Sequence, residues 1–476
     1  MKEKKENDKT LDLSDIEIDK TVKLDKTDLL ELRKKEINEK VLDLLSDKSS
    51  KELEQELEEG IDLRKKKKKR GYHLILFSIF FVPGLIFLLI VGSHSNMLIT
   101  KTVMGIIYFL LGLCFGLFVI GLVFYLKNKN IIVKTRTNIG KYLYFFVFIM
   151  YTLFCIALTI LLYGPSPEFK DWLVTTAMNT KDHKYYCQWF YNDKEIDEVF
   201  SRNYIEEPDE STDDTPVTPE PEEKIEYENE YEEAILTKEE GNEDYKIITF
   251  DINGCKGYLA VIYDPSLVKV TTTDKIGVRG QYVTTMAKRE KALVAINGAG
   301  FYDPGYSSSG GSPRGVTIVN GKIVTNNQYG KVTTGGIVGM TKDNKLVLLK
   351  NTTANQALEK GVRDAVSWGP FLIVNGKAAY TRGNGGWGYA ARTAIGQRAD
   401  GIVLFLVVDS NYNRTKGANM VDMTEIMQKY GAINAANLDG GTSSVMVVNG
   451  ELISNPIDSE LKKQTRPIAT AFIAAK

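Results

Sequence analysis

The sequence has few of the residues that build metal sites, disulfide scaffolds and histidine-dependent catalytic centres. It contains three histidines and four cysteines among 476 residues. It has no Cys-x-x-Cys pair, and no histidine lies after residue 183. These absences argue against a zinc site or a serine–histidine triad in the C-terminal half. Four cysteines are too few for a disulfide framework, although Cys187 and Cys255 could pair if they lie outside the cytoplasm.

An excess of charge of one sign is also missing, because the formal net charge is -1. The balance conceals a basic cluster at residues 64–70 and an acidic stretch at residues 206–244. A basic cluster can bind nucleic acid, but this one directly precedes an apolar run, which favours a juxtamembrane anchor. We therefore expect a membrane as a partner of this chain and no nucleic acid.

Long apolar runs are present at residues 72–92, 103–126 and 142–163, and none contains an acidic residue, lysine or arginine. Each is about 20 residues long, which as a helix crosses the hydrocarbon core of a bilayer. Buried helices of a soluble protein are the alternative. Lysines and arginines are dense before the first run and between the second and third, whereas Lys101 stands alone between the first and second. The charge pattern predicts a multi-pass protein of the cell membrane with its C-terminal domain outside the cytoplasm.

Composition divides the chain into four regions. Residues 1–71 form a charged cytoplasmic segment, either one or two solvated helices or a disordered tail. Residues 72–163 form the three-helix transmembrane region. Residues 164–244 hold an aromatic juxtamembrane stretch followed by the acidic stretch, which we expect to be an extended linker. Residues 245–476 form a folded domain.

The last region reads as strand-rich, because short β-rich runs alternate with glycine and asparagine turns. Asn320-Gly321, Asn375-Gly376 and Asn449-Gly450 each stand between two such runs and predict hairpins. Residues 422–430 predict an amphipathic helix that ends at Gly431. The expected fold class is therefore α+β: three N-terminal transmembrane helices followed by a strand-rich α+β extracytoplasmic domain.

Glycines and polar residues gather at strand ends in this domain, and their chemistry fits an anionic sugar. Arg314 and Arg392 are flanked by small residues and could each grip a phosphate with two parallel hydrogen bonds. Asp409 and Asp439 each follow an apolar run and could flank a scissile glycosidic bond. Each motif is weak by itself, and an Asp-Gly-Gly sequence is often an ordinary turn.

Taken together and in order, these motifs resemble the phosphodiester glycosidase family over roughly residues 245–476. The motifs that carry the resemblance are Ile296-Asn297-Gly298 with Phe301-Tyr302-Asp303, Gly369-Pro370 with Asn375-Gly376, Arg392-Thr393-Ala394-Ile395-Gly396, Asn437-Leu438-Asp439-Gly440-Gly441 with Ser443-Ser444, and Arg466-Pro467-Ile468-Ala469. The chain departs from the family at Ala299-Gly300 in the first motif and at Thr442, which occupies the place of a third glycine.

The resemblance implies a hydrolase that cleaves sugar-1-phosphodiester bonds, here of surface or extracellular glycans. It implies Asp439 as the principal catalytic carboxylate and Asp409 as the second, although Asp409 could equally be a structural residue at the end of a strand. The residues that we expect to bind substrate are Asn297, Gly298, Arg314, Gly369, Arg392, Thr393, Gly440, Gly441, Ser443 and Ser444.

Two further interpretations remain open at this point. A non-catalytic surface module that binds an anionic, phosphate-containing glycan could use the same residues. No cofactor is expected, although Asp303, Asp409 and Asp439 could bind a hard divalent cation such as calcium. Trp368 could stack on a sugar or fill the core, and Arg363 and Arg398 are expected to be solvated surface residues.

Overall fold

The computed structural model describes residues 35, 39, 50–95, 98–129, 139–179, 184–213, 215, 217, 226–302, 309–327, 335–413, 415–457, 462–463 and 465–476. The expected helix or tail before residue 50 lies almost entirely outside this described part. Asp303, one of the three possible cation ligands, also lies outside it.

Three long helices account for the apolar runs: α2 (Ser50–His94), α3 (Leu98–Lys127) and α4 (Ile139–Tyr163). Each contains a stretch that is long and apolar enough to cross a membrane. The first helix begins within the charged N-terminal segment and continues past Pro83. The three predicted spans are thereby confirmed as helices, while the side of the membrane on which the C-terminal domain lies stays a prediction.

The aromatic stretch after α4 folds into three short helices, α5 (Glu168–Met178), α6 (Lys184–Phe190) and α7 (Asp193–Arg202). The last of them begins with a capping box, in which Asn192 and Glu195 satisfy each other's backbone N–H groups. The helices share an apolar core with the end of α4, formed by Leu162, Val174, Ala177, Cys187, Tyr191, Ile196 and Val199. All four cysteines, Cys187 and Cys255 among them, are free thiols.

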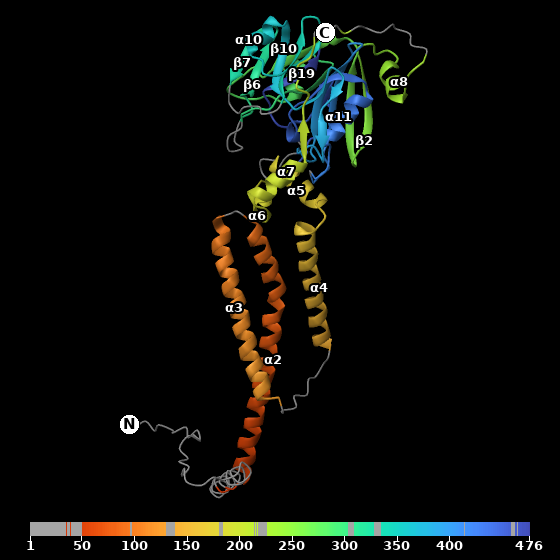
Figure 1. Cartoon of the computed structure of the whole chain (residues 1–476). Helices are drawn as coiled ribbons and strands as arrows, with labels where there is room; N and C mark the ends of the chain where they lie inside the picture. Colours follow the sequence, from red (N-terminus) through yellow and green to blue (C-terminus); the bar gives the residue numbers. More distant parts are fainter. Residues whose placement is uncertain are drawn as a thin grey trace, which may run out of the picture. The chain divides into compact units, whose positions relative to one another are not determined.

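The C-terminal domain is built on three antiparallel sheets (Figure 1). The largest has the strand order β12-β11-β16-β14-β15-β3-β2. Its strands are β2 (Tyr245–Ile252), β3 (Cys255–Ile262), β11 (Phe371–Val374), β12 (Lys377–Ala378), β14 (Arg392–Arg398), β15 (Val403–Val408) and β16 (Ala432–Asn437).

The two other sheets have five strands each, in the orders β18-β17-β5-β19-β4 and β7-β6-β10-β8-β9. The first contains β4 (Val268–Thr272), β5 (Val294–Asn297), β17 (Met446–Val448), β18 (Glu451–Leu452) and β19 (Thr470–Ala474). The second contains β6 (Gly315–Val319), β7 (Lys322–Asn327), β8 (Gly336–Thr341), β9 (Leu346–Leu349) and β10 (Val362–Trp368). A separate short pair joins β1 (Tyr204–Glu206) to β13 (Tyr380–Arg382).

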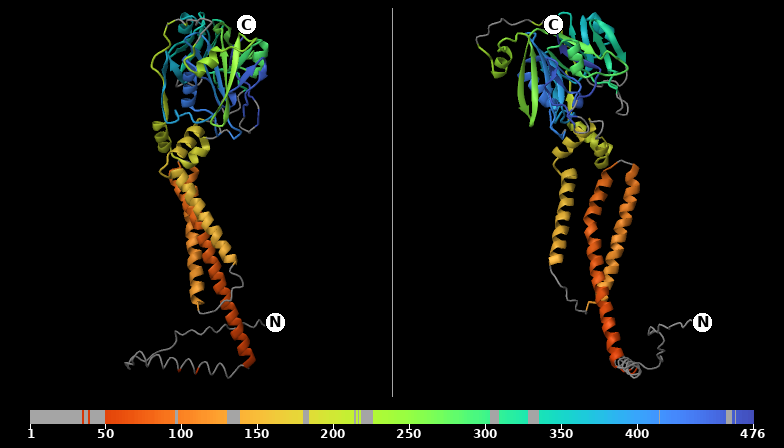
Figure 2. Two further views of the ribbon diagram at one scale, coloured as in Figure 1. Left: turned by 90° about the vertical axis from the view of Figure 1, so that its right-hand side faces the viewer. Right: turned by 180° about the vertical axis from the view of Figure 1, so that it is seen from behind.

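The three sheets enclose one central core, to which each contributes alternate side chains, such as Phe405, Phe472 and Val338. A short helix packs on the outer face of each sheet. These helices are α11 (Met420–Lys429) on the largest sheet, α9 (Val283–Arg289) on the second and α10 (Ala354–Glu359) on the third. Figure 2 shows the chain from two further sides.

Local sequence signals placed several of these elements correctly. Both residues of Asn320-Gly321, Asn375-Gly376 and Asn449-Gly450 have positive φ angles, and each pair joins two adjacent antiparallel strands. The predicted helix at residues 422–430 is α11, which begins two residues earlier because Asn419 caps it. The hairpins, this helix and the α+β class are thereby confirmed.

The acidic stretch differs from the extended linker that we expected. Over residues 204–213 it lies along the domain, where β1 pairs with β13 and the Thr212 N–H donates to the Leu348 carbonyl at 3.0 Å. Lysines of the domain neutralise its acidic side chains, as Lys345 does for Asp213 and Lys350 for Glu207. Farther on, α8 (Glu230–Leu236) buries Ile235 against the largest sheet. Matched charges and a few apolar residues therefore hold these parts of the stretch on the domain.

Candidate active site

The motifs that carry the family resemblance meet at one end of the largest sheet, at the ends of its central strands. Strand β14 begins there with Arg392, and its two neighbours, β15 and β16, end there. Arg392 pairs with Val408, so Asp409 follows at the end of β15. Ala394 pairs with Asn437, so Asp439 follows at the end of β16. The antiparallel register therefore brings Arg392, Asp409 and Asp439 to the same end of the sheet.

Arg392 is buried, and main-chain carbonyls hold its guanidinium. Nε donates to the Ala418 carbonyl at 3.1 Å, and Nη2 donates to the carbonyls of Trp387 and Gly388 at 2.6 and 2.8 Å. Burial lowers the pKa of the guanidinium to about 10, while the nearby carboxylates of Asp439 and Asp422 act in the opposite direction. Arg392 therefore keeps its charge at neutral pH in a fixed orientation.

Asp439 is partly exposed, and its backbone is fixed from both sides. Its N–H donates to the Gly298 carbonyl at 3.1 Å, and its carbonyl accepts from Asn297 Nδ2 at 2.7 Å. The next residue has little spare room, because a β-carbon on Gly440 would lie 3.1 Å from the Ala391 carbonyl oxygen and 3.4 Å from Arg392 Nη1. A partly exposed carboxylate thus lies near a buried cation.

Asn297 and Thr393 lie beneath this carboxylate and are fully buried. The Thr393 hydroxyl donates to Asn297 Oδ1 at 2.7 Å, and the same oxygen accepts from the Val445 N–H at 3.1 Å. We expected both side chains to contact substrate. In the structure these polar atoms are bonded within the protein, so they position the segment that carries Asp439.

The segment after Asp439 forms a single turn of 3₁₀ helix, η3 (Gly441–Ser443). Gly441 has a φ of +63° and open space where a side chain would be. Thr442 lies inside the turn and is absent from the positive-φ residues, so this position does not require the family's third glycine. Ser443 and Ser444 are both buried. Within the described part of the chain, no hydrogen-bond partner reaches the Ser444 hydroxyl.

Arg314 and Trp368 lie on either side of Gly300, beyond the end of β5. The Arg314 N–H donates to the Gly300 carbonyl at 3.0 Å, and a β-carbon on Gly300 would collide with the Trp368 ring at 2.2 Å. Arg314 Nε and Trp368 Nε1 are buried without a partner among the described residues. Such atoms are rare in folded proteins and point to a ligand or an ordered water. Trp368 also packs against the central core.

Gly369 precedes a cis peptide bond to Pro370 and lies beside β16. Its carbonyl accepts from Asn437 Nδ2 at 3.0 Å, and the Asn437 Oδ1 atom is buried with no described partner. Gly298 lies close to β19, since a β-carbon on it would be 2.6 Å from the Thr470 hydroxyl oxygen. Gly298 therefore allows the segment after β5 to approach β19 closely.

Asp409 is engaged elsewhere. Both of its carboxylate oxygens accept from the Asn455 N–H at 2.9 Å, and the Tyr258 hydroxyl is hydrogen-bonded to it. Burial raises the pKa of Asp409 to about 6. Side chains alternate along β15, so Asp409 faces the central core together with Val407, whereas Val408, the partner of Arg392, faces α11. The structure therefore brings Asp439, rather than Asp409, to the side of Arg392.

Two other expectations about charged residues are resolved. Arg398 is 7% exposed and forms an ion pair with Asp400 at 2.8 Å, so the expected solvated position is wrong. It lies at the end of β14 opposite to Arg392. The same expectation is wrong for Arg363, whose side chain is 17% exposed and donates to the Thr341 carbonyl. Across the described residues, no cluster of three or more metal-binding side chains occurs, and Asp303 lies outside them.

Sequence reasoning missed the main-chain groups that hold Arg392. The carbonyls of Trp387 and Gly388 belong to a loop at residues 383–389, in which Gly383, Gly385, Gly386 and Gly388 all have positive φ angles. A glycine content this high between β13 and β14 was the available signal.

Comparison with known proteins assigns this domain to a family. Residues 290–475 match the model of the phosphodiester glycosidase family. An uncharacterized SPbeta prophage-derived protein of Bacillus subtilis, YomE, is 30% identical over 201 residues, which cover 41% of this chain and 29% of that protein. N-acetylglucosamine-1-phosphodiester α-N-acetylglucosaminidase of Bos taurus is 42% identical over 69 residues, which cover 14% of this chain and 13% of the enzyme.

Among solved structures, the catalytic domain of the zebrafish N-acetylglucosamine-1-phosphodiester α-N-acetylglucosaminidase, auto-inhibited by its pro-peptide, matches 49% of this chain and 82% of that structure. Its sequence identity to this chain is 24% and its TM-score is 0.40. The chain spans less than a third of the length of the two curated relatives. Residues 290–475 form a domain of the phosphodiester glycosidase family, as the order of the motifs predicted.

Proposed function

We propose that this chain is a membrane-anchored glycosidase that hydrolyses sugar-1-phosphodiester bonds of surface or extracellular glycans. The family domain supports the reaction class. The three apolar helices and the basic residues before the first of them support an anchored domain on the outer side of the membrane.

The observation that carries the proposal is that the carboxylate of Asp439 lies close enough to Arg392 to act on its charge, beside Gly440. A phosphodiester has one negative charge shared by two oxygens. Main-chain carbonyls take up Nε and Nη2 of Arg392, so Nη1 is the nitrogen through which the guanidinium would donate to these oxygens. Arg392 is held rigidly by three hydrogen bonds to carbonyls, so it does not have to be ordered when substrate binds. The partly exposed carboxylate of Asp439 stands next to it.

The proposed reaction uses these two residues. A water oxygen bonds to the anomeric carbon, and the bond from that carbon to the phosphate oxygen breaks. The electron pair of the broken bond leaves with the oxygen, which gives a phosphate monoester that is a good leaving group. Asp439 accepts the proton of the attacking water and stabilises positive charge at the anomeric carbon. Arg392 holds the departing phosphate, and Arg314, whose Nε has no partner among the described residues, supplies a second donor.

The test uses the full-length chain in lipid nanodiscs and a panel of α-linked sugar-1-phosphodiesters. We expect equal amounts of free reducing sugar and phosphate monoester. Asp439→Asn should lower kcat by at least about 100-fold, as expected for the loss of a catalytic base. Asp343→Asn is the matched control, because Asp343 is an exposed aspartate in the turn between β8 and β9, and it should leave kcat unchanged.

Two results would overturn the proposal. Release of a sugar phosphate instead of a free sugar would mean that the wrong bond had been assigned. Binding of a phosphate-containing glycan without turnover, lost in Arg392→Ala, would identify the domain as a non-catalytic binding module.

A further inference from the structure

We propose that the short helices α5 and α7 are part of the active-site machinery, because they hold the 383–389 loop that fixes Arg392. The inference rests on the proposed function for its effect on substrate. The contacts themselves are a property of the structure. By this proposal, the residues between the apolar helices and the family domain help to position the site.

Hydrogen bonds join the two helices to the loop directly. The Asn384 N–H donates to Asn203 Oδ1 at 3.1 Å, and Asn384 Nδ2 donates to the Thr175 hydroxyl at 2.7 Å. Asn179 Nδ2 donates to the Gly386 carbonyl at 2.7 Å. Thr175 and Asn203 are buried, so water does not compete for these bonds.

The loop also lies in close contact with the helices. A β-carbon on Gly388 would lie 2.6 Å from the backbone of Thr176 in α5, and one on Gly383 would lie 2.1 Å from Asn203 Oδ1. Just before the loop, β13 pairs with β1, which follows α7 directly in the chain. The helices and the loop therefore pack without space for even one extra methyl group.

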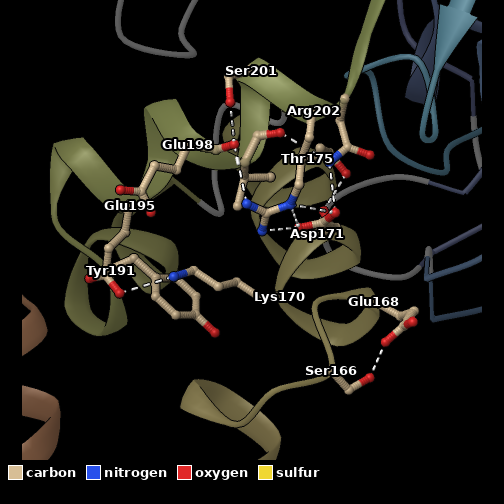
Figure 3. Close-up of polar contacts among 12 residues, drawn as sticks. Ser166, Glu168, Lys170, Asp171, Thr175, Tyr191, Glu195, Glu198, Ser201 and Arg202 are labelled. Carbon is tan, nitrogen blue, oxygen red and sulfur yellow. Dashed lines mark hydrogen bonds and ion pairs between the residues drawn. The ribbon is translucent and has the colours of Figure 1, made fainter.

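Polar contacts between α5 and α7 hold these side chains in place, and Figure 3 shows those of Asp171, Thr175 and Arg202. Asp171 accepts from Arg202 Nε at 3.0 Å and Nη2 at 2.5 Å, and from Asn203 Nδ2 at 2.8 Å. The Thr175 hydroxyl donates to the Asp171 carbonyl at 2.6 Å. Asp171 thus ties α5 to α7 and orients both Thr175 and Asn203 toward Asn384.

At its other end the loop supplies two of the three carbonyls that bind Arg392. Its glycines have wide conformational freedom in the unfolded chain, so ordering the loop has a large entropic cost. The contacts with α5 and α7 offset that cost. Without them, the carbonyls of Trp387 and Gly388 lose their fixed positions and the guanidinium loses its orientation toward substrate.

The test compares Thr175→Val with Thr175→Ser in the full-length chain in nanodiscs. Valine has the shape of threonine but cannot accept from Asn384, whereas serine can. We expect Thr175→Val to raise KM by about 10-fold, the size of a lost buried hydrogen bond, and Thr175→Ser to match the wild type. The control is Thr159→Val, which removes the same hydroxyl-to-carbonyl bond within α4. It should leave KM unchanged.

A double-mutant cycle separates positioning from a general loss of stability. If Thr175 acts through Arg392, Thr175→Val should add little to the KM of Arg392→Lys, because the oriented guanidinium is already gone. Additive effects of the two substitutions on KM would overturn the inference. So would a loss of kcat in Thr175→Val with unchanged KM and a lower melting temperature.

Hydrogen–deuterium exchange of the peptide that covers residues 383–392 tests the inference apart from turnover. We expect faster exchange in Thr175→Val than in Thr175→Ser or Thr159→Val. If the wild type hydrolyses no phosphodiester, the proposed function fails, and this exchange result still decides whether the helices hold the loop. Equal exchange in all three variants would overturn the inference even in an active enzyme.

Discussion

The side-chain amide of Asn297 donates to the main-chain carbonyl of Asp439 across 2.7 Å, joining the end of β5 to the end of β16. The oxygen of the same amide accepts from the Thr393 hydroxyl and from the Val445 N–H. One fully buried side chain therefore links three segments of two sheets at the candidate site.

Replacing Asn297 by leucine should destabilise the domain and inactivate it together. The substitution keeps the volume but leaves a buried hydroxyl, an N–H and a carbonyl without partners, each worth about 1–3 kcal/mol. Thermal unfolding should show a clear drop in melting temperature and turnover should fall. Asn413→Leu, at an exposed position, should change the free energy of unfolding by less than about 0.5 kcal/mol. A stable but inactive Asn297→Leu chain would instead indicate direct contact with substrate.

Adjacent glycines at the site should respond differently to alanine. Gly440 has an extended backbone (φ -111°), which alanine adopts freely, but its β-carbon would approach Arg392 Nη1. Gly440→Ala should therefore lower kcat/KM by about 10-fold or more with little change in melting temperature. Gly441 has a φ of +63° and open space around it, so Gly441→Ala should cost about 1 kcal/mol in unfolding free energy. Steady-state kinetics and denaturant unfolding of both variants check the contrast.

Two buried arginines of β14 provide a matched pair. Arg392 lies at the site, and Arg398 lies at the other end of the strand, where it pairs with Asp400 and donates to the Tyr430 carbonyl. Lysine keeps the charge but loses the planar fork, so both substitutions should destabilise the chain by about 1–3 kcal/mol. Arg392→Lys should in addition raise KM, whereas Arg398→Lys should leave it unchanged. An equal rise of KM in both would show that the effect is merely structural.

Stability should fall as pH rises through the titration of Asp409. Its pKa is about 6 in the folded chain against an ordinary value of 3.8, so the folded state binds more protons between these values. The unfolding free energy should therefore be highest below about pH 4 on account of this group. It should decrease by on the order of 3 kcal/mol toward pH 7. Asp409→Asn should remove this component of the pH dependence, as measured by urea unfolding at a series of pH values. An unchanged slope would contradict the raised pKa.

The membrane topology can be checked with a thiol reagent that does not cross membranes. Tyr412 is 66% exposed in the domain, and Lys67 is exposed in the basic cluster before the first apolar run. Tyr412→Cys should be labelled on intact cells, and Lys67→Cys only after permeabilisation. The parent chain is the background control, since its four cysteines are buried. The reverse pattern of labelling would place the domain in the cytoplasm.

The sequence predicted features that depend on neighbouring residues. An Asn-Gly pair sets a hairpin turn, and Asn419 with Asp422 sets the start of α11, because both signals act within a few residues. The order of the motifs also predicted the family that residues 290–475 match. Three of the partners of Arg392 could not be predicted, because Ala418, Trp387 and Gly388 act through their main chain and their residue type carries no signal.

The acidic stretch shows a second limit of sequence reasoning. Charge density alone predicts a solvated, extended chain. The lysines that neutralise it lie more than a hundred residues away, as Lys345 does from Asp213. Such pairing is visible only in three dimensions. For the same reason, burial of Arg398 by Asp400 and α11 could not be seen in the composition of β14.

Four residues, 164–167, separate the end of α4 from the start of α5. A chain of that length spans at most about 14 Å. Because α5 is hydrogen-bonded to the 383–389 loop, no long flexible linker separates α4 from the domain. For the membrane-anchored glycosidase that we propose, turnover should therefore follow the density of glycan at the bilayer surface rather than its concentration in bulk medium. A domain severed from α4 would lose this restriction and diffuse freely in solution.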